Sequence, residues 1–149
     1  MVVKALENIE NLTVKQISII NNKDMSKAIN IDLKTDKDYI PDGVNMINAQ
    51  FMWSKGITGK DVKIAVIDSG CDMTHKDLQT RITGGRNFTI EDNKNIYKYQ
   101  DYNGHGTHVC GTIAASNNNY GVIGVAPDAK LLILKALDKN GSGSIKGII

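Results

Sequence analysis

A short apolar run at residues 62–67 is the feature that most limits how this chain can fold. Four of its six residues are β-branched, which predicts a buried β-strand. The run ends in Asp68-Ser69-Gly70, so a carboxylate follows the strand directly. In α/β proteins, ligands bind at the carboxyl ends of the strands. We therefore expect Asp68 to lie at the rim of a functional site.

A second segment provides a partner for this carboxylate. Residues 103–112 hold His105 between two glycines, Gly104 and Gly106, and then continue with small and β-branched residues. Glycine at such positions indicates a sharp turn or a close approach of the backbone to a neighbour. The small residues predict a tightly packed helix that begins at His105 and ends near Ser116. An aspartate that orients a histidine and stabilises its imidazolium supplies two of the three members of a nucleophilic triad.

These segments, in this order, resemble the aspartate and histidine blocks of the subtilisin-like serine proteases (subtilases). Within that family, the sequence most resembles the intracellular members. A third block, residues 121–143, also resembles the family, and the resemblance runs from about Ile40 to the C-terminus. It implies that His105 is the general base and that Asp68 holds its tautomer. The sequence contains no segment like Gly-Thr-Ser-Met-Ala, so neither the serine nor the oxyanion-hole asparagine of the family can be assigned.

The fold class follows from these elements. Residues 129–137 predict a second apolar strand, and two strands linked by a glycine-initiated helix indicate an α/β protein with a parallel sheet. The resemblance implies the three-layer subtilisin-like fold, of which this chain is about the first half. Such a half-sheet would leave an apolar edge and face uncovered. Residues 39–149 would be the N-terminal part of a catalytic domain, truncated before the serine block.

Other segments give weaker signals. Residues 1–38 are interpreted as an N-terminal extension, either a short propeptide or a flexible leader without a role. Residues 45–53 have apolar positions at helical spacing and predict one short surface helix. Residues 83–103 are rich in Gly, Asn, Asp and Tyr, which predicts a long surface connection. Ser144 is a candidate cap for a helix that begins at Ile145.

The resemblance extends to a calcium site. Residues 116–122 resemble the loop of the family's high-affinity site, and calcium binds carbonyl, amide and carboxylate oxygens. The implied ligands are the carbonyls of Ser116, Tyr120 and Val122, the side chain of Asn118, and the carboxylates of Asp77 and Asp38. A solvated Asn-rich turn is the alternative. No organic cofactor is expected.

The resemblance also implies a substrate-binding edge. Gly141-Ser142-Gly143 is similar to the segment that pairs with an extended substrate backbone by strand addition, and a plain Gly-Ser turn is the alternative. Leu137 is similar to a residue that lines the pockets for substrate side chains.

A zinc site is the main rival for the histidines. His105 and His108 are three residues apart and could face one metal ion on a helix. Zinc proteases instead place two histidines four apart, with a glutamate between them, and here Gly106 and Thr107 intervene. We therefore interpret His108 as a buried structural residue. Cys110 is interpreted as a small buried hydrophobe.

Composition limits the partners. The chain is 41% hydrophobic and 23% charged with a net charge of +2, which is ordinary for a soluble domain. Lys and Arg are scattered, so nucleic acid is not an expected partner. No apolar stretch approaches membrane-spanning length, and the first residues lack the apolar core of a signal peptide. We therefore expect a cytoplasmic protein that binds polypeptide substrates and neither nucleic acid nor membranes.

The sequence thus predicts a serine endopeptidase that uses an Asp-His-Ser triad. The 149 residues by themselves are expected to hydrolyse no peptide bonds, because the nucleophile is missing. The alternative is a non-catalytic truncated or split subtilase that binds peptides or a complementary C-terminal segment.

Overall fold

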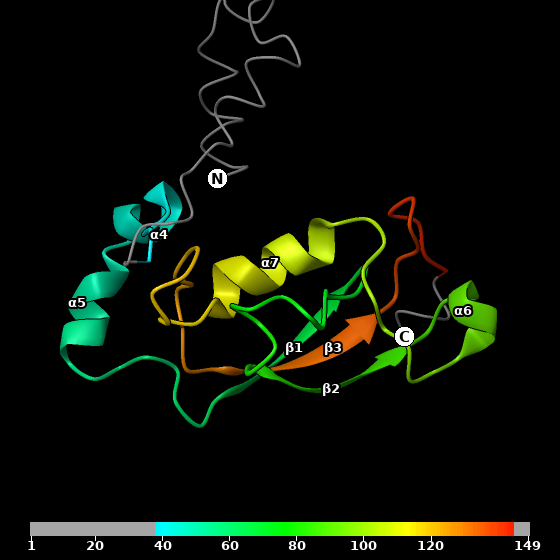
Figure 1. The fold of residues 1–149 in the computed structure, drawn as a ribbon, viewed down its shortest axis with the longest axis horizontal. Coiled ribbons are helices and arrows are strands. Elements are labelled where there is room, and N and C mark those ends of the chain that lie inside the picture. The colour runs from blue at the N-terminus through cyan, green and yellow to red at the C-terminus, as the bar shows by residue number, and fades with distance from the viewer. Residues whose placement is uncertain (1–37, 145–149) are drawn as a thin grey trace, which may run out of the picture.

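A three-stranded parallel sheet with one helix across it forms the centre of the computed structural model, which describes residues 38–144 (Figure 1). The strands are β1 (Lys63–Asp68), β2 (Ile82–Asn87) and β3 (Lys130–Lys135), in the order β1-β3-β2. The helix is α7 (His105–Ala114). The predicted α/β class and parallel sheet are confirmed. The second helical layer of a three-layer fold is not found within residues 38–144, and residues 1–37 and the helix predicted from Ile145 lie outside the described residues.

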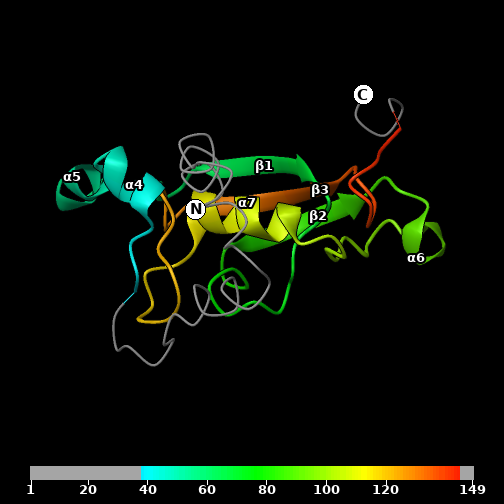
Figure 2. The ribbon, with the colours of Figure 1, turned by 90° about the horizontal axis from the view of Figure 1, so that it is seen from above.

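The carboxyl ends of the strands and the first turn of α7 share one end of the sheet. Asp68 is paired in register with Lys135, so the last residues of β1 and β3 lie side by side. Helix α7 starts at this end and runs back over the sheet (Figures 1 and 2). Asp68 and His105 are therefore brought to the same rim.

Small side chains let α7 pack closely on the sheet. Gly106, Cys110 and Ala114 are its buried residues, and their spacing of four places them on one face of the helix. They lie over the buried strand residues of the core, which include Val66, Leu131 and Ile133. The prediction of a tightly packed helix is confirmed, and its end at Ala114 lies two residues before the predicted end.

Among the residues that the structure describes, elements cover only one face of β1. Its residues alternate, with Val66 and Asp68 buried toward α7 while Ile67 on the other face is 54% exposed. Residues 62–67 were predicted to form a buried strand: the strand is confirmed as Lys63–Asp68, but only one of its faces is buried, because α7 covers only that face. The expected uncovered apolar face is present: Ala65 and Ile67, on the face of β1 opposite α7, are both exposed.

Strand β2 was not predicted. Residues 83–103 were expected to be a surface connection, yet β2 pairs with β3 inside this range. Gly84 and Gly85 carry no side chain that could show an alternating pattern. Gly85 is required here, because a Cβ atom would lie 2.5 Å from the carbonyl oxygen of Ile133 and 2.9 Å from the Tyr99 ring.

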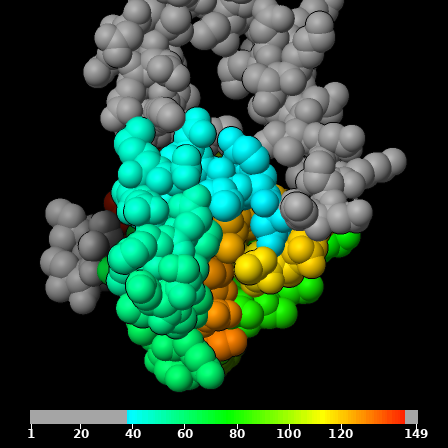
Figure 3. Space-filling view, turned by 90° about the vertical axis from the view of Figure 1, so that its left-hand side faces the viewer, coloured from blue at the N-terminus to red at the C-terminus, as the bar shows by residue number. Residues whose placement is uncertain are grey.

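Three short helices flank the sheet. The predicted single helix over residues 45–53 is two helices, α4 (Asp42–Met46) and α5 (Ala49–Ser54). They separate at Asn48, whose φ of 55° interrupts the helical backbone. Both lie at one end of the molecule (Figures 1 and 3), and α6 (Glu91–Lys94) lies at the other, near the strand carboxyl ends. No helix among residues 38–144 is long and apolar enough to cross a membrane.

Candidate active site

Asp68 and His105 form a hydrogen-bonded pair. Nδ1 of His105 lies 2.8 Å from Oδ1 of Asp68 and 3.0 Å from Oδ2. Asp68 is buried, whereas the His105 side chain is 65% exposed. The carboxylate therefore binds one ring nitrogen and leaves the imidazole open to solvent, which suits a histidine that exchanges protons with a reactant.

The two glycines around His105 have different functions. Gly104 is the N-cap of α7 with a φ of 97°, so it makes the turn that starts the helix. Gly106 faces the loop after β1: its N–H donates to Oγ of Ser69 at 2.9 Å, and an added Cβ atom would collide with the carbonyl oxygen of Gly70. The helix can approach Asp68 only because this position has no side chain.

Asp101 holds the segment that leads into the helix, and sequence reasoning missed it. Its Oδ1 accepts hydrogen bonds from Oγ of Ser69 and from the N–H groups of Asn103 and Gly104. Its Oδ2 accepts from the N–H and hydroxyl of Thr107, at 2.9 and 2.7 Å. Burial alone would raise the pKa of Asp101, but these hydrogen bonds outweigh it and hold the pKa far below its ordinary value. The signal in the sequence was an Asp two residues before Asn103-Gly104, a pattern typical of an Asx turn.

The pair affects the ionisation of the histidine. The hydrogen bond to Asp68 and its negative charge raise the pKa of His105, with a smaller contribution from Asp101, although partial burial acts in the opposite direction. The stability that the charged pair contributes is fully present below the ordinary histidine pKa of 6.5. That stability is lost as the pH rises through the higher folded-state pKa.

We expect Asp68→Asn to lower the pKa of His105 toward its ordinary value, because the substitution removes the charge that stabilises the imidazolium. The measurement is an NMR titration of the imidazole resonances, with His105→Ala to assign them. Asp61→Asn is the control, because Asp61 is an exposed carboxylate just before β1, at the opposite end of that strand from Asp68. A His105 pKa that is the same in the wild type and in Asp68→Asn would contradict the pairing.

The implied calcium ligands gather in one place. Asp77 is buried, and its carboxylate accepts from Nδ2 of Asn118 at 3.1 Å and from the N–H of Val122 at 3.3 Å. Asp38 accepts from the N–H groups of Asn119 and Tyr120, in the same loop. Burial raises the pKa of Asp77, partly offset by the hydrogen bonds from Asn118 and Val122.

Some backbone oxygens of this loop are engaged in hydrogen bonds and others are not. The carbonyl of Ala115 accepts from Gly124, and that of Gly121 accepts from Tyr39. Among the described residues, no donor is found for the carbonyls that the resemblance assigns to calcium, those of Ser116, Tyr120 and Val122.

The implied substrate edge is a tight turn beside His105. Asp138 binds the backbone of Ser142 twice, through its own N–H and through Oδ1, so Ser142 has both backbone groups engaged. Gly143 is exposed and has no recorded backbone hydrogen bond within residues 38–144. Nδ2 of Asn103 donates to the carbonyl of Lys139 at 3.0 Å, which ties this turn to the segment before His105. Leu137 is half-buried beside it, and its N–H donates to the Asp68 carbonyl at 3.1 Å.

Two further predictions have different outcomes. The prediction that His108 is buried is wrong, because its side chain is exposed on the outer face of α7. Partial burial still lowers its pKa, and His105 adds to the effect. Cys110 is fully buried as predicted, and so is Cys71.

Comparisons with known proteins agree with this geometry. The model of the subtilase family (Peptidase_S8) matches residues 59–149. The chain is 52% identical over 115 residues to a major intracellular serine protease of Bacillus subtilis, covering 76% of this chain and 36% of the relative. It is 56% identical over 110 residues to an intracellular serine protease of Paenibacillus polymyxa, covering 74% and 33%. A thermostable alkaline protease of Halalkalibacterium halodurans is 43% identical over 138 residues, covering 92% and 36%. The chain thus spans about a third of the length of these relatives.

Proposed function

The chain belongs to the subtilase family, and we propose that it is part of a serine endopeptidase in which Asp68 and His105 are two members of an Asp-His-Ser triad. The observation that carries this proposal is the 2.8 Å contact between the buried Asp68 carboxylate and Nδ1 of the exposed His105. The third member comes from a serine-bearing segment outside these 149 residues. The names of the relatives, serine proteases, support the same reaction class.

The geometry gives Asp68 and His105 different roles in the proposed reaction. With Nδ1 held by Asp68, the proton of neutral His105 resides on Nδ1, and Nε2 is free to accept the proton of an attacking serine. The imidazolium that results is stabilised by the Asp68 carboxylate. His105 then returns the proton to the leaving amine, and a water molecule hydrolyses the acyl-enzyme by the same route.

The substrate is a polypeptide in extended conformation. Gly143 offers backbone groups for strand addition at the edge of the turn, whereas the backbone of Ser142 serves the turn itself. Beside them lies a cavity of about 270 Å³, lined by Phe88, Ile90 and Gly143 among others. Its apolar wall suits a hydrophobic side chain of the substrate.

A structural calcium ion fits the loop at residues 116–122. Asp77 supplies a buried carboxylate, Asp38 lies against the same loop, and three carbonyl oxygens lack donors among the described residues. Asn118 now donates to Asp77, but a rotation of its amide group would present the oxygen instead. Bound calcium would fix the loop and the N-terminal segment at Asp38 together, and would not take part in the chemical steps.

We expect calcium to raise the melting temperature of the protein, because an ion that binds only the folded state stabilises it by mass action. Asn118→Ala should remove most of this increment, and Asn117→Ala, the exposed neighbour in the same loop, should keep it. The measurement is thermal unfolding with calcium, with magnesium and with a chelator. An equal calcium response in the two variants would exclude Asn118 as a ligand.

The cytoplasm is the proposed location. The supporting observation is that two of the relatives are named intracellular serine proteases. Cell fractionation with an antibody against this chain tests it, and recovery of the protein from the culture medium would contradict it.

A chimera tests the proposed function. The segment of the Bacillus subtilis relative that matches this chain is replaced by the corresponding residues of this chain, so that the relative supplies its C-terminal part. We expect the chimera to hydrolyse a chromogenic peptide, and His105→Ala to abolish that hydrolysis. A folded chimera that binds the peptide without cleaving it would support the non-catalytic alternative.

A further inference from the structure

Lys135 is a completely buried lysine next to the candidate active site. It ends the central strand β3, and its side chain is 0% exposed. Lysine is almost never fully buried unless its charge is paired. Here the ammonium donates to the carbonyl of Ser69 at 2.6 Å and lies 3.0 Å from Oε2 of Glu91. The ring of Tyr102 is 5.3 Å away, so a third group faces the charge.

One side of this lysine holds the turn that carries Asp68. Ser69 is fully buried, so its carbonyl needs a donor inside the protein, and Lys135 provides it. The carbonyl of Asp68 accepts from the N–H groups of Ala136 and Leu137, at 2.9 and 3.1 Å. The end of β3 therefore holds both carbonyls of the Asp68–Ser69 turn.

The other side of Lys135 reaches the implied substrate edge through Glu91. Oε1 of Glu91 accepts from the N–H of Lys139 at 3.0 Å, in the turn that leads to Gly143. Glu91 also begins α6, where residues 92–94 have φ values between 54° and 61°. This left-handed turn is unfavourable for residues other than glycine and needs tertiary contacts to persist.

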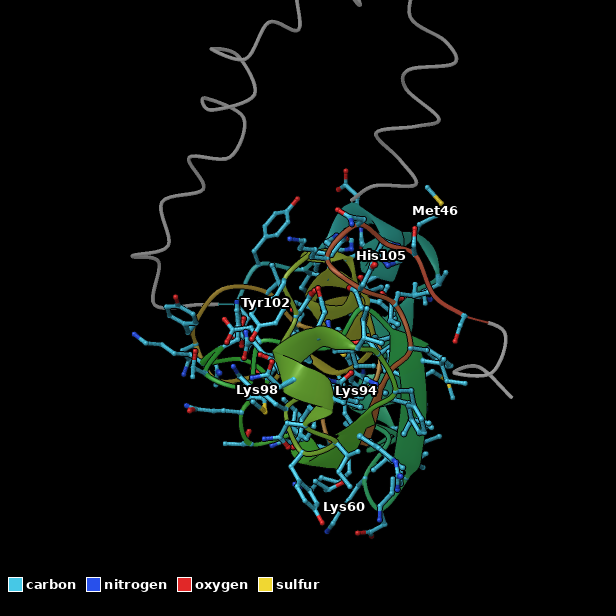
Figure 4. The ribbon with its side chains drawn as sticks, turned by 90° about the vertical axis from the view of Figure 1, so that its right-hand side faces the viewer. Met46, Lys60, Lys94, Lys98, Tyr102 and His105 are labelled. Atoms are coloured by element: carbon cyan, nitrogen blue, oxygen red, sulfur yellow. The ribbon has the colours of Figure 1, made fainter. Side chains whose placement is uncertain are left out.

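A second set of contacts secures the same turn. Asp92 forms an ion pair with Lys98 at 2.6 Å and accepts from the hydroxyl of Tyr102 at 2.9 Å. Tyr102 is three residues before His105 in the chain, and Figure 4, which faces the end of the molecule that carries α6, labels both together with Lys98. The segment before the histidine, α6 and the end of β3 thus meet around Lys135.

We infer that Lys135 is a positioning residue, whose ion pair with Glu91 fixes the Asp68 turn relative to the turn of residues 138–142. The inference rests on the proposed function, because it assigns Asp68 the task of orienting His105. Lys135 touches neither member of the pair in a hydrogen bond and acts through the backbone of Ser69. The bridge also explains why a charged pair, rather than apolar side chains, occupies this part of the core.

The position of Asp68 can be read from the ionisation of His105. The charged groups that act on His105 are Asp68 and Asp101, which raise its pKa. Removing Lys135 and Glu91 together removes one positive and one negative charge, whose direct effects on the pKa of His105 oppose each other. If Asp68 moves away from the ring, the pKa falls. A clear fall in the double variant therefore reports a displaced Asp68.

The test is an NMR titration of His105 in the full chain, which needs no proteolytic activity. K135M/E91Q is the main variant, because it removes both charges, leaves the net charge unchanged and leaves no unpaired ion in the core. We expect the pKa of His105 to fall by about half a unit or more, roughly a threefold change in proton affinity. K130M is the matched control: Lys130 begins the same strand and also donates to a backbone carbonyl, that of Thr80, at 3.0 Å. It should leave the pKa unchanged.

The outcomes separate the possible failures. An unchanged or raised His105 pKa in folded K135M/E91Q overturns the positioning role. If the Asp68→Asn variant keeps the wild-type pKa of His105, the premise that Asp68 orients His105 is overturned instead. If K135M/E91Q does not fold, E91Q alone is used, which keeps the bond from Lys135 to Ser69. It should speed hydrogen exchange at the backbone N–H of Lys139, which donates to Glu91. Unchanged exchange there would contradict the proposed link from Lys135 through Glu91 to the turn of residues 138–142.

Discussion

Asp68→Asn is expected to lower kcat by about 10⁴-fold in the active chimera, as in related triads. The introduced asparagine would still fill the space after β1, so the fold is retained. Its amide group, however, can donate to Nδ1 of His105, and the ring would then be held with its proton on Nε2. That tautomer cannot accept the proton of the serine. The measurement is steady-state hydrolysis of a chromogenic peptide, and KM should change little because Asp68 is buried.

The histidines provide the controls for this prediction. His105→Ala removes the base, and the double variant with Asp68→Asn should be barely worse than His105→Ala alone, because members of a triad act as a unit. His108→Ala should leave both kcat and stability close to wild type, since its side chain is exposed. If His108→Ala abolished turnover and His105→Ala kept it, the two roles would be reversed.

Gly106→Ala is expected to destabilise the protein by roughly 3 kcal/mol, the upper end of the usual cost of overpacking. Alanine favours a helix interior over glycine by about 1 kcal/mol, but here the clash dominates. The added Cβ atom would meet the backbone carbonyl of Gly70 and lie 3.1 Å from Oγ of Ser69. Neither neighbour can yield without a shift of the turn after Asp68, so the hydrogen bond that His105 donates to Asp68 should weaken as well.

Gly111→Ala is the matched control in the same helix. An added Cβ atom at Gly111 meets nothing within 4 Å. Only the helix propensity remains, so this variant should be stabilised by about 0.5–1 kcal/mol. Urea denaturation followed by circular dichroism measures both free energies of unfolding. Equal losses in the two variants would show that the close approach at Gly106 is not what makes glycine necessary there.

Local patterns were enough to single out Asp68 and His105, which form a hydrogen-bonded pair in the structure. The apolar run before Asp68 and the glycines around His105 predicted a strand end and a helix start, and both are observed. Each signal depends on residues that are neighbours in the chain. The resemblance to subtilases then related the two segments, which are 37 residues apart. The same signals could not say which face of β1 would remain exposed, because that depends on what packs against it.

The supporting residues depended on the tertiary structure. Strand β2 forms because its backbone pairs with that of β3. Its glycines have no side chains, so they show no alternating pattern from which a strand could be predicted. Lys135 resembled any lysine at the end of a strand, and only the folded chain places Ser69 and Glu91 around it. A sequence determines the conformations that a few neighbouring residues prefer. Burial and ion pairing are properties of groups that meet from distant parts of the chain, so for Lys135 only the packing of β1, β3 and α6 could decide them.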